Sequence, residues 1–212
     1  NILKKSLSID LFASLQNGTL IDVFDKGGDI DISEYDDSAL YKKLTLSNPE
    51  QLSVIKKIAR SYENFKLYLS SDGEITYEYL WDLISMPNPS LFPRGINVVI
   101  LELREEDITD NVHIICPSNH YSSTFFDVNI RSAIFVKIGN LYEPIITYED
   151  KDNKYIINRQ FSLKYKDIVP ALRSSLETIK SALNDKCGAL PSKPNIYKFK
   201  TNISLERLVY LL

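Results

Sequence analysis

The stretch Ile96-Asn97-Val98-Val99-Ile100-Leu101-Glu102-Leu103 decides the fold class of this 212-residue chain. Its continuous apolar run, Val98 to Leu101, is typical of a strand that is buried on both faces at the centre of a sheet. Before this stretch, apolar residues recur at helical spacing; after it, they occur in short runs bounded by turn residues. The sequence therefore predicts helices first and a sheet second.

Three helices are predicted before residue 90. The first spans residues 8–16 and ends at Asn17-Gly18, a common helix-stop signal. Asn48-Pro49 places an N-cap residue before a proline in the first helical position, and it begins a long amphipathic helix that ends near residues 71–73. The third helix spans residues 76–85, and the prolines that follow it stop it.

Five strands are predicted after residue 95. Their ranges are 96–103, 112–116, 130–138, 142–148 and 154–158. Gly139-Asn140 is a two-residue hairpin signal, and residues 150–153 predict a second hairpin. Pro144 has no N–H to donate to a ladder, so its strand is expected at an edge or at a bulge.

Residues 167–186 predict a last long helix, with leucine and isoleucine along one face. The fold class is therefore α+β, with a five-stranded, mainly antiparallel meander sheet flanked by N-terminal and C-terminal helices. We expect a single α+β domain over residues 1–190. Its helical part is 1–90, its sheet part is 95–160, and the helix 167–186 completes it. A linker and the start of a further helix are expected over residues 191–212.

Composition argues against several classes of protein. The formal net charge is -3, whereas a dedicated nucleic-acid binder would carry a basic footprint. The apolar runs are far shorter than the roughly 18 residues of a membrane span, and no apolar signal segment follows Asn1. Cys116 and Cys187 could pair in principle, but two cysteines in a chain of this size suggest reduced thiols, so the protein is expected to be intracellular and not secreted. Because Asn1 is not a methionine, we interpret the chain as a piece of a longer protein.

The segment Cys116-Pro117-Ser118-Asn119-His120 is the most chemically suggestive part of the chain. Cys116 could act as a nucleophile activated by His120, with Asn119 or Asn111 orienting the imidazole. Catalytic triads are usually assembled from distant segments, because local geometry rarely aligns three side chains. We favour the interpretation that Cys116 ends a buried strand as a small apolar residue and that His120 is a polar loop residue. No catalytic residue is therefore assigned, and Cys116, His120 and Asn119 remain the candidates.

No metal or cofactor site is predicted. Zinc held by His113, Cys116 and His120 would need a fourth ligand, and the chain has no Cys-x-x-Cys pair. Residues 24–37 are rich in carboxylates, but their spacing does not fit a calcium-binding loop, so we interpret them as a solvated loop.

A nuclease-like set of carboxylates is a weaker alternative. The set Asp82, Glu102 and Arg104 contains the residue types that occur in the active sites of metal-dependent phosphodiesterases. However, Asp82 falls in a predicted helix, and Glu102 and Arg104 fit the solvated alternate positions of a strand.

An ordered series of phrases along nearly the whole chain resembles an uncharacterised family of very large proteins in nucleocytoplasmic large DNA viruses, the relatives of mimivirus and iridovirus. The phrases are Ser14-Leu15-Gln16-Asn17-Gly18-Thr19-Leu20, Tyr62-Glu63-Asn64-Phe65, Tyr79-Leu80-Trp81-Asp82-Leu83-Ile84, Gly95-Ile96-Asn97-Val98-Val99-Ile100-Leu101-Glu102, Asp107-Ile108-Thr109-Asp110-Asn111-Val112, Cys116-Pro117-Ser118-Asn119, Tyr142-Glu143-Pro144-Ile145 and Tyr197-Lys198-Phe199-Lys200-Thr201-Asn202-Ile203. The resemblance implies an internal domain of a large viral protein and no particular activity.

The chain also resembles, more faintly, the OTU-type cysteine peptidases. Those enzymes place a histidine beside an aromatic residue on a late strand, where this chain has Leu141-Tyr142-Glu143. Their Asp-Gly-Asn-x-Cys segment is absent. The resemblance therefore implies that any catalytic parts lie upstream of Asn1 or have been lost.

From these observations we expect a non-catalytic structural or protein-interaction module of a large viral protein. Its partner is expected to be a protein, viral or host, with ubiquitin among the candidates, rather than nucleic acid or a membrane. The alternative is an OTU-like cysteine peptidase (a deubiquitinase domain) whose active site is degenerate or lies partly outside the chain.

Overall fold

The structure is a computed structural model that describes residues 2–43, 46–74, 76–103, 112–117, 120–151, 154–164, 170–187 and 210–211. Two compact units emerge. The first comprises residues 1–84, 118–121 and 191–203, and the second comprises residues 85–117, 122–190 and 204–212. Each unit is described by itself. No helix in the part of the chain that the structure describes is long and apolar enough to cross a membrane.

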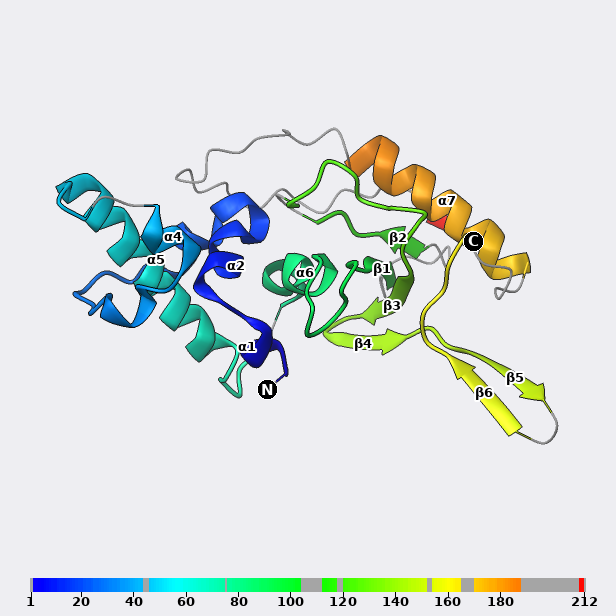
Figure 1. Ribbon diagram of the computed structural model, residues 1–212. Helices are drawn as coiled ribbons and strands as arrows, with labels where there is room; N and C mark the ends of the chain where they lie inside the picture. Colours follow the sequence, from blue (N-terminus) through cyan, green and yellow to red (C-terminus); the bar gives the residue numbers. More distant parts are fainter. Residues whose placement is uncertain are drawn as a thin grey trace. The chain divides into compact units, whose positions relative to one another are not determined.

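The first unit is built from helices (Figure 1). They are α1 (Ile2–Ser6), α2 (Ile9–Ser14), the 3-10 helix η1 (Leu15–Gly18), α3 (Leu20–Phe24), the 3-10 helix η2 (Ser33–Tyr35), α4 (Ala39–Lys42), α5 (Pro49–Tyr68) and α6 (Tyr77–Ser85). The predicted start of the long helix is confirmed, because Asn48 Oδ1 accepts a hydrogen bond from the Glu50 N–H at 2.9 Å. The short helices α1, α3 and α4 were not predicted. Each spans five residues or fewer, which is too short for apolar residues to recur at helical spacing.

Aromatic rings form the core of the first unit. The ring centroid of Phe65 lies 5.3 Å from that of Phe12 and 5.0 Å from that of Phe24. Phe24 also packs edge-on against Tyr79 of α6 at 5.3 Å. Tyr79 also contacts Tyr68 of α5 at 5.6 Å. These separations are those of favourable aromatic pairs, so aromatic contacts join α2, α3 and α6 to α5.

The carboxylates of residues 22–29 bind basic side chains of α5. Asp25 accepts a hydrogen bond from Arg60 Nε at 2.9 Å, and both side chains are about four-fifths buried. Lys56 pairs with Asp29 at 2.7 Å. Most of residues 24–37 are exposed, as expected of a solvated loop, but Asp25 is largely buried by its contact with Arg60. A pattern search within the acidic segment alone cannot detect these ion pairs with α5.

The second unit contains the sheet, with strand order β4-β3-β1-β2 and a two-residue strand at its edge (Figure 1). The strands are β1 (Asn97–Leu103), β2 (Val112–Ile114), β3 (Ser132–Ile138), β4 (Leu141–Pro144) and β7 (Tyr210–Leu211). The edge position expected of Pro144 and the hairpin at Gly139-Asn140 are confirmed. Of the predicted helix in the C-terminal tail, the structure describes only Tyr210 and Leu211, and these pair with β2.

The prediction of a five-stranded meander is wrong in two respects. First, β1 and β3 are neighbours and parallel, with Val99 opposite Ile134. Second, the predicted strand 142–148 is divided between β4 and β5 (Thr147–Lys151), and β5 pairs with β6 (Lys154–Asn158) in a separate two-stranded sheet. Continuous apolar runs do not specify which neighbour a strand pairs with, and burial on both faces favours the parallel arrangement seen here.

Helix α7 (Pro170–Lys186) covers one face of the sheet (Figure 1). Its buried side chains Leu176, Ile179 and Leu183 form a single core with Val99 and Ile134 of the central strands. The predicted apolar face of this helix is confirmed. The first three residues of the predicted range, 167–169, lie outside the described residues.

Gly95 lies where the chain turns from α6 into β1. Its φ is +76°, and a Cβ at this position would lie 2.6 Å from the Ser85 carbonyl oxygen. That oxygen also accepts the Ile96 N–H at 3.0 Å, so the two backbone segments are held in contact. Only glycine fits both the left-handed backbone and the close approach.

We expect Gly95→Ala to lower the free energy of unfolding by about 1–3 kcal/mol, since the backbone must shift to admit a methyl group. The matched control is Gly139→Ala, which shares a positive φ but has open space around the new Cβ. Urea denaturation of both variants measures the difference. Equal losses would show that backbone strain, and not the contact with Ser85, explains the glycine.

We expect Arg60→Gln to destabilise the chain by about 0.5–1 kcal/mol at neutral pH. The Arg60 side chain holds the pKa of Asp25 below its ordinary value of 3.8. A lowered folded pKa stabilises the native state above the unfolded pKa, and this contribution is lost as pH falls through the folded pKa. The difference between wild type and variant should therefore shrink below about pH 4.

The control for this experiment is Lys42→Gln, because Lys42 pairs at 3.5 Å with a fully exposed Asp37. We expect no measurable change in its denaturation midpoint at any pH. A difference for Arg60→Gln that stays constant down to pH 2 would contradict the assignment to Asp25.

Candidate functional site

The two cysteines form a disulfide. Cys116 lies two residues after β2 and Cys187 directly follows α7; their Cα atoms are 5.6 Å apart. The expectation that both thiols are reduced is wrong for this structure, because the end of α7 brings two residues that are 71 positions apart in the sequence into contact. In this state Cys116 carries no thiol, so it is not a nucleophile.

His120 is buried beside Asp82. Its Nδ1 lies 2.6 Å from Asp82 Oδ1, and the Asp82 side chain is only 1 % exposed. An ionised carboxylate can only accept hydrogen bonds, so the Nδ1–H donates to Asp82. His120 does lie in a loop, as expected, but its imidazole is buried within the first unit.

The other oxygen of Asp82 is bound by two backbone groups. Oδ2 accepts the Gln16 N–H at 2.8 Å and the Tyr121 N–H at 3.0 Å. One carboxylate on α6 thus joins η1 and the segment that carries His120. Hydrogen bonds from backbone N–H groups to a carboxylate are charge-assisted, and they compensate for the burial of a negative charge.

The turn that meets Asp82 has an unusual backbone. Gln16 and Asn17 have φ angles of 47° and 53°, in the left-handed region that few residues other than glycine adopt. Asn17 Nδ2 donates to the His120 carbonyl oxygen at 2.8 Å, and Thr19 Oγ1 donates to the Gln16 carbonyl oxygen at 3.0 Å. The Gln16 side-chain amide donates to the Glu78 carbonyl oxygen. Such a strained backbone conformation persists only where several surrounding contacts hold it, as these hydrogen bonds do here.

This arrangement has two chemical uses in proteins. A buried aspartate that binds the Nδ1–H of histidine orients the ring in many hydrolases. The same contact also stabilises a fold when the carboxylate binds backbone groups as well. Because Asp82 binds the backbone of Gln16 and Tyr121, its position here is that of a clamp between segments.

The remaining candidate residues do not join this cluster. His113 is buried in β2, where it pairs with Glu102 of β1, and Glu102 binds Lys137 at 2.8 Å. Asn119, with Asn111 and Arg104, lies outside the described residues. Within the described ranges, no three His, Cys, Asp or Glu side chains are placed to hold a metal ion.

Sequence reasoning missed Gln16 and the role of Asp82. The structure buries Leu83 completely and Asp82 almost completely, so the inward face of α6 includes an acid. An aspartate on the buried face of a helix is a signal that a partner must exist, but the sequence does not name that partner.

A second feature is an exposed apolar surface on the hairpin β5–β6. Most of the large apolar side chains that are exposed in the described part of the chain fall between residues 138 and 157. Tyr148 and Tyr155 are each 71 % exposed, and their rings contact each other edge-on at 6.3 Å. Ile157, 51 % exposed, lies directly opposite Tyr148 in the register. We call these three side chains the hairpin face.

Comparison with known proteins gives one distant relative. Over 100 residues the chain is 26% identical to an uncharacterized protein of Acanthamoeba polyphaga mimivirus; the match covers 43% of this chain and 6% of that protein. The matched part of the chain is thus similar to a small part of a much longer giant-virus protein, which supports the viral part of the resemblance. No family model and no solved structure matches. No match supports the likeness to OTU-type peptidases.

We expect Asp82→Ala to lower the free energy of unfolding by about 2–3 kcal/mol. Alanine removes both acceptor oxygens, so the Gln16 and Tyr121 N–H groups and the His120 ring lose their common partner. The control is Asp37→Ala, since the Asp37 side chain is fully exposed. Urea denaturation of both variants measures the difference. Similar midpoints for Asp82→Ala and Asp37→Ala would rule out a clamp at this position.

Proposed function

We propose that this chain is a non-catalytic protein-interaction module of a large viral protein and that the hairpin face is its contact surface. The observation that carries this proposal is the exposure of Tyr148, Tyr155 and Ile157 on one face of a two-stranded sheet. The proposed place of action is the host cytoplasm or the virion.

The hairpin β5–β6 has exposed apolar side chains and strand edges that a partner could cover. An isolated two-stranded hairpin is marginally stable in water, and exposed apolar side chains that are grouped together mark interaction surfaces. Figure 1 shows β5 and β6 extending away from the four-stranded sheet of the same unit. In the described part of the chain, β5 and β6 pair only with each other, so each has an outer edge with backbone donors and acceptors.

This geometry favours a protein partner that supplies an extended apolar segment. Such a segment would add a strand to one edge of the hairpin, and its alternate side chains would pack on the tyrosine rings. Tyrosine suits this role because it combines a large apolar surface with a hydroxyl that can bind the partner.

The alternative function is a cysteine peptidase of OTU type. The pair Asp82–His120 is the observation in its favour, because such enzymes need an oriented imidazole. Against it, the chain has only two cysteines and both are in the disulfide. Covalent labelling of the chain by a ubiquitin electrophile probe would support this alternative over the interaction module.

The proposal is tested by photocrosslinking from the hairpin. Benzoylphenylalanine is placed at position 155 and, as a control, at position 67, where Leu67 is an isolated exposed residue of α5. We expect a specific protein adduct from position 155 and none from position 67. The partner identified in this way is then purified for binding measurements.

The double variant Tyr148→Ser/Tyr155→Ser should bind the purified partner about tenfold or more weakly, whereas Leu67→Ser should bind it as wild type does. Both outcomes are read from the dissociation constant. An unchanged dissociation constant for the double variant, or no adduct specific to position 155, would contradict the proposal.

A further inference from the structure

The outer edge of β6 is an apolar strand edge. Tyr155, Ile156 and Ile157 follow one another in this strand and are 71 %, 44 % and 51 % exposed. Because successive side chains of a strand point to opposite faces, Ile156 lies on the face opposite to Tyr155 and Ile157. Alternate residues of an antiparallel strand direct their backbone groups away from the strand they pair with, so β6 offers donors and acceptors at this edge.

Two other strand edges of the second unit are protected against pairing. The edge strand β4 contains Pro144, which has no N–H to donate to a ladder. β5 has three charged residues in succession at positions 149–151, and charged residues on an edge strand oppose pairing. By contrast, β6 has no proline, no bulge in its five-pair register and a single charged residue, Lys154, at its start. An added strand is therefore opposed least at β6.

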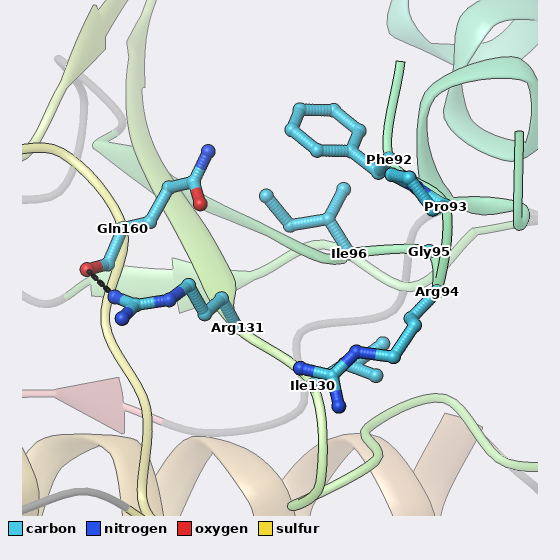
Figure 2. A pocket seen from close by; sticks show the side chains of 8 residues that line it. All are labelled: Phe92, Pro93, Arg94, Gly95, Ile96, Ile130, Arg131 and Gln160. Atoms are coloured by element: carbon cyan, nitrogen blue, oxygen red, sulfur yellow. Dashed lines mark hydrogen bonds between the residues drawn. The ribbon is translucent and has the colours of Figure 1, made fainter. Parts of the chain in front are cut away.

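Both legs of the hairpin are fixed where they leave the larger sheet of the second unit. Before β5, the Ile145 N–H donates to a carbonyl oxygen of β3 at 2.9 Å. After β6, Ser132 and Phe161 exchange two backbone hydrogen bonds of 2.7 and 2.9 Å. Figure 2 shows the Arg131 side chain hydrogen-bonded to the Gln160 carbonyl oxygen, at 3.4 Å. The base of β6 is thus held before any partner binds, which lowers the entropic cost of binding.

The sequence of β6 is complementary to itself when two copies run antiparallel. In the register centred on Ile156, Tyr155 of each copy would lie opposite Ile157 of the other. An aromatic residue opposite a β-branched one is a favourable cross-strand pair. Lys154 of each copy would lie opposite Asn158 of the other, so this register places no like charges opposite each other.

We propose that two copies of this chain associate through antiparallel pairing of their β6 strands, which forms a four-stranded sheet. This inference rests on the proposed function, because it identifies the partner of the hairpin as a second copy. Each Ile157 would lie between Tyr148 of its own hairpin and Tyr155 of the second copy, which covers apolar surface that is exposed in one chain. Two strands alone are marginally stable, whereas a sheet of three or more strands with an apolar face is stable. The copies are related by a twofold axis at Ile156, so the contact closes as a dimer.

The test is sedimentation velocity of the whole chain at concentrations from about 5 to 500 µM. Two five-residue strands make a smaller contact than the roughly 1,200–2,000 Å² of a standard interface, so we expect a dissociation constant of about 10–100 µM. Ile156→Lys places two cations directly opposite each other and should weaken the dimer at least about tenfold. The matched control, Leu67→Lys, adds the same charge at an exposed position of α5 and should change the dissociation constant less than about twofold.

Charge variants of Asn158 test the register. Asn158→Asp places a carboxylate opposite Lys154 and should tighten the dimer about threefold, whereas Asn158→Lys places two cations opposite each other and should weaken it about threefold or more. The net charge of the chain alone predicts the reverse order. It is -3, so aspartate increases the repulsion between two copies and lysine reduces it.

A wild-type chain that stays monomeric at the highest concentration would overturn the inference. So would a dimer that Ile156→Lys leaves intact, or charge variants of Asn158 that shift the dissociation constant in the same direction. The inference and the proposed function fail separately. A monomeric chain that still crosslinks from position 155 to a different protein overturns the dimer alone. A dimer that responds to Ile156→Lys but not to Tyr148→Ser/Tyr155→Ser supports the paired edge and contradicts the hairpin face as the contact surface.

Discussion

The carboxylate of Asp82 is the constraint on which the first unit depends. It sits on α6, is almost fully buried, and accepts hydrogen bonds from the Gln16 N–H, the Tyr121 N–H and the His120 ring. A buried carboxylate is stable only when several hydrogen-bond donors surround it. The contact between α6, η1 and the loop that carries His120 and Tyr121 must therefore form as a whole. The left-handed backbone at Gln16 and Asn17 lies at the same contact, where the Gln16 N–H donates to Asp82.

The second unit is stabilised by an apolar core and a disulfide. Its parallel central strands, β1 and β3, pack against α7 through one apolar face, and the disulfide Cys116–Cys187 joins the end of α7 to the segment after β2. A cross-link that closes a loop of this length removes many conformations from the unfolded chain. The features proposed for binding, the hairpin face and the outer edge of β6, both lie in this unit, where a rigid core can support exposed recognition surfaces.

Local signals in the sequence predicted much of the secondary structure. Asn48-Pro49 begins α5, the run Val98 to Leu101 is buried at the sheet centre, and Gly139-Asn140 closes a hairpin, because each is decided by residues that are neighbours in the chain. Long-range relations were not predictable. The sequence does not show that β1 pairs with β3, that Cys187 reaches Cys116, or that Asp82 meets His120, since each depends on how separate elements pack. For the same reason, His120 was identified as a candidate but its partner was not.

The central claim is that Asp82 clamps the first unit through backbone groups and that the His120 ring takes part in the same contact. Hydrogen exchange of the Gln16 and Tyr121 amides tests this most directly, since both N–H groups donate to one oxygen of Asp82. The account predicts that both amides exchange slowly in the wild-type chain and that both lose protection together in Asp82→Ala, which removes the acceptor oxygens. Fast exchange at either amide in the wild type, or protection that survives Asp82→Ala, would contradict it.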